Sequence, residues 1–316
     1  MYLNMLGDNE EPEDTVFDNK GQVSRSGIVG GKFVDIKTVP YLAQIISFGD
    51  LTCGASIISK EWLLTAAHCV ERINPDYESD YGERSIYVRT GSTIRGKGEL
   101  FEVAKIIVHE HFNSITMDND IALIKTAETI EFDDQQKPIS ISDLIPKPGD
   151  EIEVAGFGKE GEDKPKPKTL KAAVLPVIDS TDCNTKYKKV YPYQRVIITD
   201  NMFCSFKKGE DTCHGDSGGP AVIDNQLVGI ISWGYDCGAS GLPGVYTLLR
   251  NYRKWISNHT AYPMLCARKD KDDTCEGDSG GSAVINGKLV GIVSWGFDCA
   301  ASKLPSVYTL AKNYHE

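Results

Sequence analysis

The sequence predicts an all-β fold followed by a repeated C-terminal segment, and three observations support this. Short runs of β-branched and aromatic residues alternate with Gly, Pro, Asn and Asp along most of the chain, which is typical of many short strands in a barrel or sandwich. Only one apolar run has helical spacing, at Tyr252, Trp255 and Ile256, and it predicts a short helix near the end of the main body. Residues 264–314 repeat residues 202–252 at a constant offset, with 33 of 51 aligned positions identical.

The elements follow in order along the chain. Residues 1–27 are acidic, rich in turn formers and without an apolar period, so we expect a flexible leader. The strand texture begins at Ile28. A stretch with Gly, Asp and Pro, Lys159–Lys168, is expected to form an exposed loop. The strands expected most clearly are Tyr41–Ser47, Ser85–Arg89, Phe101–Val108, Glu151–Ala155 and Leu227–Ser232.

Size and charge narrow the classes of function. A chain of 316 residues can bury one large all-β core or two smaller ones. The formal net charge of −11 argues against nucleic acid as a partner, because phosphates need a basic surface. The longest apolar runs, such as Leu227–Ile231, are too short to cross a membrane. Met1–Asn19 shows no apolar stretch of the kind found in signal peptides.

Three short motifs contain the residue types that together make a serine nucleophilic. His68 lies in the run Thr-Ala-Ala-His-Cys, Asp120 directly precedes Ile-Ala-Leu, and Ser217 lies in Gly-Asp-Ser-Gly-Gly-Pro. A serine hydroxyl is a weak nucleophile at neutral pH, so it needs a base to take its proton and an acid to orient that base. Asp118 lies two residues before Asp120 and is the rival for the acid. The remaining histidines match no catalytic motif: His109, His111, His214, His259 and His315.

These motifs, in this order, resemble the chymotrypsin/trypsin family of serine endopeptidases over residues 28–258. The resemblance implies two six-stranded antiparallel β-barrels, a short C-terminal helix and an active site in the cleft between the barrels. It implies His68 as general base and acid, Asp120 as the orienting carboxylate and Ser217 as the nucleophile. The backbone N–H groups of Gly215 and Ser217 would form the oxyanion hole.

The same resemblance implies a specificity for basic residues. Asp211, six residues before Ser217, would lie at the bottom of the primary specificity pocket and demand Arg or Lys in the substrate. Gly234 and Gly244 would line that pocket. The backbone of Ser232, Trp233 and Gly234 would pair with an extended substrate. The alternative interpretation of Asp211 is a solvated surface carboxylate.

Activation departs from the family pattern. The resemblance implies that cleavage before Ile28 creates an amine that pairs with Asp216. The residue before Ile28 is Gly27, and the nearest basic residue is Arg25. Cleavage after Arg25 would leave Ser26 at the new terminus, two residues away from the required position.

Nine cysteines indicate an oxidising compartment. The resemblance implies three disulfides, although spacing alone leaves fifteen pairings of six cysteines open. Reduced thiols in a cytosolic enzyme are the alternative. We expect a secreted, extracellular protein. The implied pairs are Cys53–Cys69, Cys183–Cys204 and Cys213–Cys237.

No metal or other cofactor is expected. The segment Gly91–Leu100 holds a single acidic residue together with Arg95 and Lys97, which does not suit calcium. An acidic cluster at Asp76–Glu83 lies in an apparent surface insertion and is expected to form a solvated loop.

Residues 259–316 are interpreted as an incomplete duplicate of residues 202–252. The copy has a serine motif around Ser279 but no histidine or aspartate loop. Cys266 corresponds to Cys204 and has no second copy of Cys183 to meet. Fusion of a segment from a diverged paralogue explains both the identities and the eighteen differences. We expect this tail to be dispensable and poorly ordered; the alternative is that it docks on the body or replaces the original segment.

The function expected from these patterns is a trypsin-like serine endopeptidase, made as a zymogen, that cleaves after Arg or Lys through an acyl-enzyme. Its partners would be protein or peptide substrates and proteinaceous protease inhibitors, with no nucleic acid and no membrane. The alternatives are a non-catalytic protease homologue that acts as a binding module, and an incorrectly fused, inactive product.

Overall fold

The structure is a computed structural model that describes most of residues 28–260 and four strands of the C-terminal segment. The described residues are 28–71, 86–161, 163–190, 196–235, 237, 241–260 and the strands between 264 and 310. The expected leader 1–27 and the acidic cluster Asp76–Glu83 lie outside them. No described helix is both long and apolar enough to cross a membrane.

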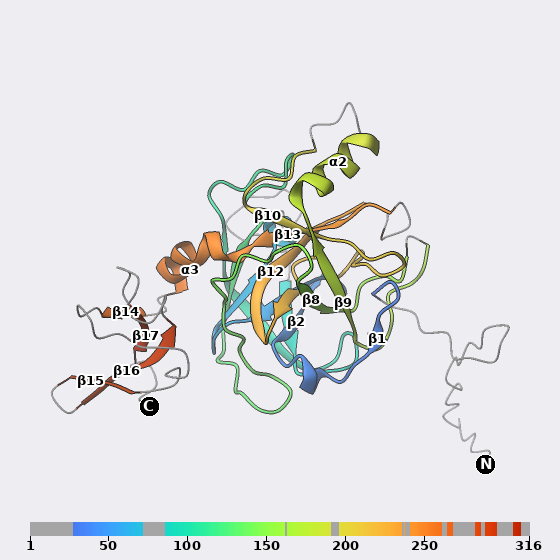
Figure 1. The fold of residues 1–316 in the computed structure, drawn as a ribbon. Coiled ribbons are helices and arrows are strands. Elements are labelled where there is room, and N and C mark those ends of the chain that lie inside the picture. The colour runs from blue at the N-terminus through green and yellow to red at the C-terminus, as the bar shows by residue number, and fades with distance from the viewer. Residues whose placement is uncertain are drawn as a thin grey trace, which may run out of the picture.

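The first half of the chain forms a closed antiparallel barrel (Figure 1). Its strand order is β2-β3-β4-β7-β6-β5. In β5, residues Ile86, Val88 and Thr90 are buried while the residues between them are partly exposed, so the period of two turns one face of the strand into the barrel. The strands are β2 (Leu42–Ser47), β3 (Asp50–Ile57), β4 (Trp62–Thr65), β5 (Ile86–Thr90), β6 (Glu99–Val108) and β7 (Ala122–Thr126).

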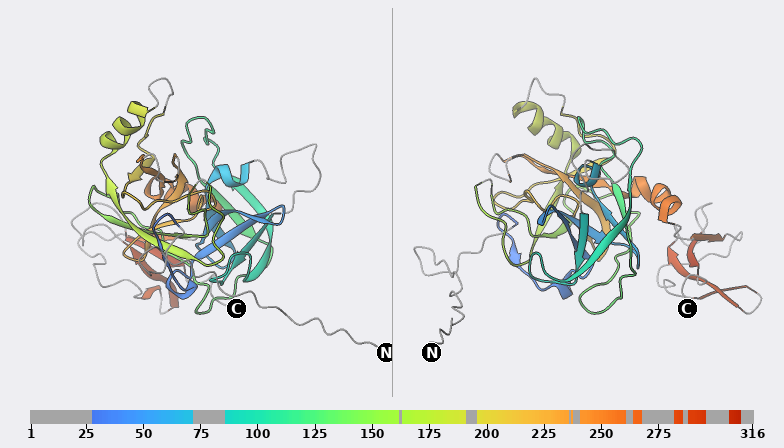
Figure 2. Two further views of the ribbon diagram at one scale, coloured as in Figure 1. Left: turned by 90° about the vertical axis from the view of Figure 1, so that its right-hand side faces the viewer. Right: turned by 180° about the vertical axis from the view of Figure 1, so that it is seen from behind.

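The second half forms another closed six-stranded antiparallel barrel. The order is β9-β10-β13-β12-β11-β8, and pairing of β8 with β9 closes it. A short strand, β1 (Lys32–Phe33), adds to the outer edge of β9. Figure 2 shows the two barrels side by side. The strands are β8 (Glu151–Gly156), β9 (Lys171–Ile178), β10 (Met202–Ser205), β11 (Pro220–Ile223), β12 (Gln226–Trp233) and β13 (Gly244–Leu248).

The expected fold class is confirmed, and each strand predicted from sequence lies within two residues of an observed one. The predicted C-terminal helix is α3 (Arg253–Thr260), preceded by a 3₁₀ turn, η4 (Leu249–Tyr252). Trp255 and Ile256 are buried in the cluster that fills the first barrel. Trp255 Nε1 also donates to Glu110 Oε2 at 2.8 Å. The helix therefore ties the end of the second barrel to the first.

The expectation of a single helix was wrong, because α2 (Ser180–Val190) follows β9. Only Cys183 and Tyr187, four residues apart, are buried along it, so its apolar period is too sparse to recognise in the sequence. Tertiary links stabilise it instead. Cys183 is bonded to Cys204, and Tyr187 Oη donates to the carbonyl of Pro243 at 2.5 Å.

The four C-terminal strands repeat the pairing of the second barrel. They form a separate sheet in the order β14-β17-β16-β15, as in β10-β13-β12-β11. The register is the same at an offset of 62: Met264 pairs with Thr309 as Met202 pairs with Thr247. In the second barrel, β9 pairs with the outer side of β10 and β8 with the outer side of β11. Within the described strands, β14 and β15 have no such partners. The strands are β14 (Met264–Ala267), β15 (Ser282–Ile285), β16 (Lys288–Trp295) and β17 (Ser306–Leu310).

Truncation after Thr260 is expected to leave the thermal unfolding midpoint and any peptidase activity unchanged, because both barrels close without residues 261–316. Truncation after Tyr252 is the control. It removes α3 with buried Trp255 and Ile256, each side chain worth about 1.5–3 kcal/mol of burial, so the midpoint should fall sharply. A loss of stability or activity on truncation after Thr260 would make the tail part of the folded enzyme.

Candidate functional site

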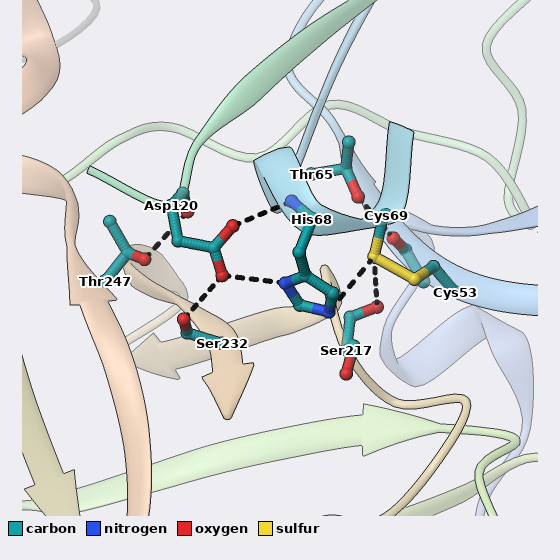
Figure 3. Close-up of polar contacts among 9 residues, drawn as sticks. Cys53, Thr65, His68, Cys69, Asp120, Ser217, Ser232 and Thr247 are labelled. Carbon is teal, nitrogen blue, oxygen red and sulfur yellow. Dashed lines mark hydrogen bonds and ion pairs between the residues drawn. A yellow bond between two sulfur atoms is a disulfide. The ribbon is translucent and has the colours of Figure 1, made fainter. Parts of the chain in front are cut away.

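His68 and Asp120 are brought together by the pairing of β4 with β7. His68 lies on the short helix α1 (Ala67–Val70), just after β4, and Asp120 lies two residues before β7. Asp120 Oδ1 accepts from the backbone N–H of His68 at 2.9 Å, and Oδ2 lies 2.8 Å from His68 Nδ1 (Figure 3). A carboxylate at Nδ1 keeps the proton on that nitrogen and leaves the lone pair on Nε2.

The second barrel also holds Asp120 in place. Ser232 Oγ on β12 donates to Asp120 Oδ2 at 2.5 Å, and Thr247 Oγ1 on β13 donates to the carbonyl of Asp120 at 2.8 Å. The Asp120 side chain is fully buried, whereas 27% of the His68 side chain is exposed. The sequence interpretation used only the backbone of Ser232 and missed this hydrogen bond, because a serine in a strand gives no sign of what lies across the barrel interface.

Asp118, the alternative candidate for the orienting carboxylate, bonds to residues of the second barrel instead. Asp118 Oδ1 accepts from Thr199 Oγ1 at 2.7 Å and from Asn201 Nδ2 at 3.0 Å. These residues precede β10 in the second barrel, so Asp118 links the two barrels at the edge of the site. Within the described residues, the backbone N–H and Nδ1 of His68 bond to Asp120 and not to Asp118.

Ser217 lies in the turn before β11, at the Nε2 edge of His68 (Figure 3). Its carbonyl accepts from the backbone N–H of Gly54 on β3 at 2.7 Å. Cys69 Sγ lies 3.6 Å from that carbonyl and 3.7 Å from His68 Nε2. Within the described residues, Ser217 Oγ and His68 Nε2 make no hydrogen bond. Such bonds are often long in enzymes without substrate and shorten when it binds.

Two backbone N–H groups beside Ser217 have no partner within the described part of the chain, those of Gly215 and of Ser217 itself. Gly215 has φ +106°, which a side chain tolerates poorly. A Cβ there would also lie 3.1 Å from Gly158 Cα and 3.2 Å from Lys166 Cε. The sequence therefore needs glycine at this turn, and the turn leaves two donors free to bind an anion.

Asp216 is buried beneath the serine turn. Its Oδ1 accepts from the N–H of Gly158 at 2.7 Å and its Oδ2 from the N–H of Cys213 at 3.0 Å. Burial raises the pKa of Asp216 to about 6, although both N–H donors act to lower it. The Ile28 side chain is fully buried in the core of the second barrel, and Val29 O accepts from Asp211 N at 3.1 Å. The segment that begins at Ile28 thus lies against the loop that holds Asp211 and Asp216.

Asp211 is 6% exposed and accepts from the N–H of Thr212 at 2.8 Å. Burial raises its pKa to about 7; the Thr212 bond lowers it and the charge of Asp216 raises it. The described residues include no ion pair to this carboxylate. A Cβ at Gly244 would lie 3.1 Å from Asp211 Oδ1, so glycine there keeps the space in front of the carboxylate open. Gly234 lies opposite, near Gly244 Cα.

The structure contains the same three cystine pairs that the resemblance implies: Cys53–Cys69, Cys183–Cys204 and Cys213–Cys237. Cys53, Cys69 and His68 place three potential ligand atoms within 4.8 Å of one another. Both sulfurs are in the disulfide, so this cluster offers no thiolate to a metal. Cys275 and Cys299 lie outside the described residues, and of Cys266 only the backbone is described.

His109 and His259 lie apart from this site. The rings of Tyr252 and Trp255 pack against His109, with centroids 5.2 and 5.0 Å away. Burial lowers the pKa of His109, with opposing effects from neighbouring charges. His259 Nδ1 lies 2.9 Å from the carbonyl of Trp255 within α3. These histidines therefore belong to the packing of the C-terminal helix. His315 lies outside the described residues.

Comparisons with known proteins agree with this geometry. The profile of the family described as Trypsin matches residues 28–256 and again residues 258–316. Trypsin-3 of Salmo salar is 37% identical over 235 residues, covering 73% of this chain and 92% of its own. Trypsin of Sus scrofa is 37% identical over 238 residues, with 74% and 96% covered. The structure of neuropsin, a serine protease expressed in the limbic system of mouse brain, aligns with a TM-score of 0.62 and 31% identity, over 73% of this chain and 98% of that one.

Proposed function

Because the chain belongs to the trypsin family of serine endopeptidases, we propose that it hydrolyses peptide bonds after Arg and Lys through an acyl-enzyme. It is a serine-type endopeptidase, and its substrates are proteins. The observation that carries the mechanism is the His68 imidazole, held at Nδ1 by a buried carboxylate while its Nε2 edge faces Ser217. This arrangement favours a catalytic protein over a non-catalytic homologue.

The proposed reaction has two stages. Ser217 Oγ attacks the carbonyl carbon of the scissile bond and gives its proton to His68 Nε2, and Asp120 stabilises the imidazolium. The carbonyl oxygen, now negative, accepts hydrogen bonds from the free N–H groups of Gly215 and Ser217. His68 then protonates the leaving amine, and the C–N bond breaks to give an ester on Ser217. A water molecule, deprotonated by His68, hydrolyses the ester and restores the enzyme.

The preference for basic residues rests on Asp211. A carboxylate that is 6% exposed and has no ion pair within the described residues gains most from a cation that enters the pocket. Gly244 leaves space in front of it for a long side chain. The backbone of Ser232, Trp233 and Gly234 would pair with the residues that precede the scissile bond. Proteinaceous inhibitors that present an Arg or Lys would bind the same cleft.

Two further expectations belong to this proposal. Proteins of this family that carry disulfides typically work outside the cell, and we propose a secreted enzyme. We also propose that cleavage before Ile28 activates it. The buried Ile28 side chain and the contact of Val29 with Asp211 place the start of this segment beside the loop of Asp216, whose raised pKa marks a carboxylate that an ammonium would stabilise.

The mechanism is tested by labelling with an irreversible arginyl phosphonate. We expect modification at Ser217 alone, since only this serine has His68 and Asp120 beside it. Ser217→Ala should lower kcat on arginyl amides by about 10⁵- to 10⁶-fold, the scale known for serine proteases that lose their nucleophile. Labelling at Ser279, or turnover retained by the variant, would move the reaction to the C-terminal copy. Absence of labelling and of turnover in the activated protein would support the non-catalytic alternative.

The pocket assignment predicts a pH dependence for the binding of benzamidine, an aromatic cation. Asp211 has a pKa near 7 in the free protein, and a cation favours its charged form. Affinity should therefore be highest above pH 7 and fall by up to about tenfold per unit below it. Calorimetry in a His68→Ala background removes the titration of the imidazole. Asp211→Asn should bind weakly at every pH; constant affinity between pH 5 and 9 in the parent protein would contradict the assignment.

The activation proposal is tested with two engineered precursors in which a specific protease site leaves either Ile28 or Ser26 as the first residue. Only the Ile28 form should hydrolyse arginyl amides, because two extra residues displace the amine from Asp216. Asp216→Asn in the Ile28 form is the matched control and should lose most of the activity, measured per folded molecule. Full activity of the Ser26 form would refute the pairing.

A further inference from the structure

Lys166 joins the two barrels at the edge of the candidate site. It lies in the loop between β8 and β9 of the second barrel. Its Nζ donates to the carbonyl of Leu51 and lies 3.4 Å from Asp50 Oδ2. Asp50 and Leu51 open β3 of the first barrel. The ammonium group of Lys166 therefore spans the boundary on which the cleft lies.

The same side chain borders the serine turn. A Cβ built on Gly215 would lie 3.2 Å from Lys166 Cε and 3.6 Å from its Cδ. The methylene groups of Lys166 thus cover the backbone whose N–H is free to bind the substrate carbonyl. Its side chain is 18% exposed, whereas that of Asp50 is 72% exposed. Lys166 therefore lies packed against Gly215 at the barrel boundary, and Asp50 is its solvated partner.

The position of Lys166 relative to His68 indicates which half of a substrate it meets. Ser232, where the residues before the scissile bond would pair, contacts Asp120 on the Nδ1 side of the imidazole. Leu51 lies two residues before Cys53, whose disulfide partner Cys69 contacts the Nε2 side. Figure 3 shows the two sides opposite each other. A peptide extended across Ser217 would leave the site along the Lys166 side.

The ion pair between Lys166 and Asp50 is one in which a substrate carboxylate can replace Asp50. Partial burial acts to raise the pKa of Asp50, but the Lys166 charge and the Leu51 N–H outweigh it, so the pKa lies below its usual value. The two groups therefore interact, yet an ion pair with one partner so exposed is weak and screened by salt. In a protein of net charge −11, this ammonium is a local site for a substrate carboxylate.

We propose that Lys166 makes this peptidase prefer substrates with an acidic residue among the first three positions after the scissile bond. An extended peptide advances about 3.3 Å per residue, so these positions pass the Lys166 ammonium just beyond Gly215. The substrate carboxylate takes the place of Asp50 at Nζ. This inference rests on the proposed roles of Ser217 and Gly215, because they set the direction of the peptide.

The test uses matched peptides with one Arg before the scissile bond and Asp or Asn at each of the three following positions. For the wild type we expect kcat/KM for the Asp peptide to exceed that for the Asn peptide by about two- to fivefold at one position. Lys166→Gln should bring this ratio to about one, and Lys166→Arg should keep it. Asp50→Asn should raise the ratio, because it removes the competitor. Raising the salt concentration should lower it.

Lys164→Gln is the matched control, because Lys164 is exposed in the same loop and no described contact places it at the cleft; the ratio should not change. Active-site titration with the phosphonate corrects each variant for misfolded protein. An Asp-to-Asn ratio of one in the wild type, a ratio kept by Lys166→Gln, or a ratio lowered by Asp50→Asn would each overturn the proposal. An arginyl 4-nitroanilide has no residue after the scissile bond. Its hydrolysis by the wild type therefore tests the proposed function separately.

Discussion

The rest of the structure depends on one buried carboxylate, that of Asp120, at the boundary of the two barrels. Its side chain has no exposed surface, and an unpaired charge in such a place costs several kcal/mol. Two donors come from His68 in the first barrel and one from Ser232 in the second. The carboxylate is satisfied only when the barrels are docked, so the same hydrogen bonds that orient the imidazole also fix the relation between the two halves of the chain.

Around Ser217, the proposed nucleophile, the absence of side chains at the glycines matters as much as the side chains that are present. A Cβ at Gly156 or Gly158 would collide with the Asp216 carboxylate, and one at Gly218 would collide with Thr65 and Gly54. These glycines let backbone from both barrels approach the serine turn closely. The turn keeps its N–H donors free because Gly215 adopts φ +106°. Close packing and free donors are therefore two results of the same local composition.

The many short strands were sufficient to predict an all-β fold. The two barrels and the proximity of His68 to Asp120 were implied by the resemblance that the motifs around His68, Asp120 and Ser217 carry. The sequence was insufficient where structure arises between distant segments. Helix α2 has only two buried positions and is held by a disulfide and a tyrosine hydroxyl. The side-chain bond of Ser232 to Asp120 and the contacts of Lys166 cross the barrel boundary, and a local pattern cannot reveal a partner more than a hundred residues away.

The C-terminal copy shows that residues 202–252, the segment it repeats, contain only part of the candidate site. Strands β14, β15, β16 and β17 keep the register of β10, β11, β12 and β13, including both bulges. In the first copy, β8 and β9 close the sheet, the segments after β4 and before β7 contain His68 and Asp120, and β3 binds the carbonyl of Ser217. All of these lie upstream of residue 202 and have no repeat after it. A repeat of 51 residues can duplicate a strand pairing, but it cannot duplicate the proposed catalytic base, because His68 belongs to the first barrel and the repeat begins at residue 202.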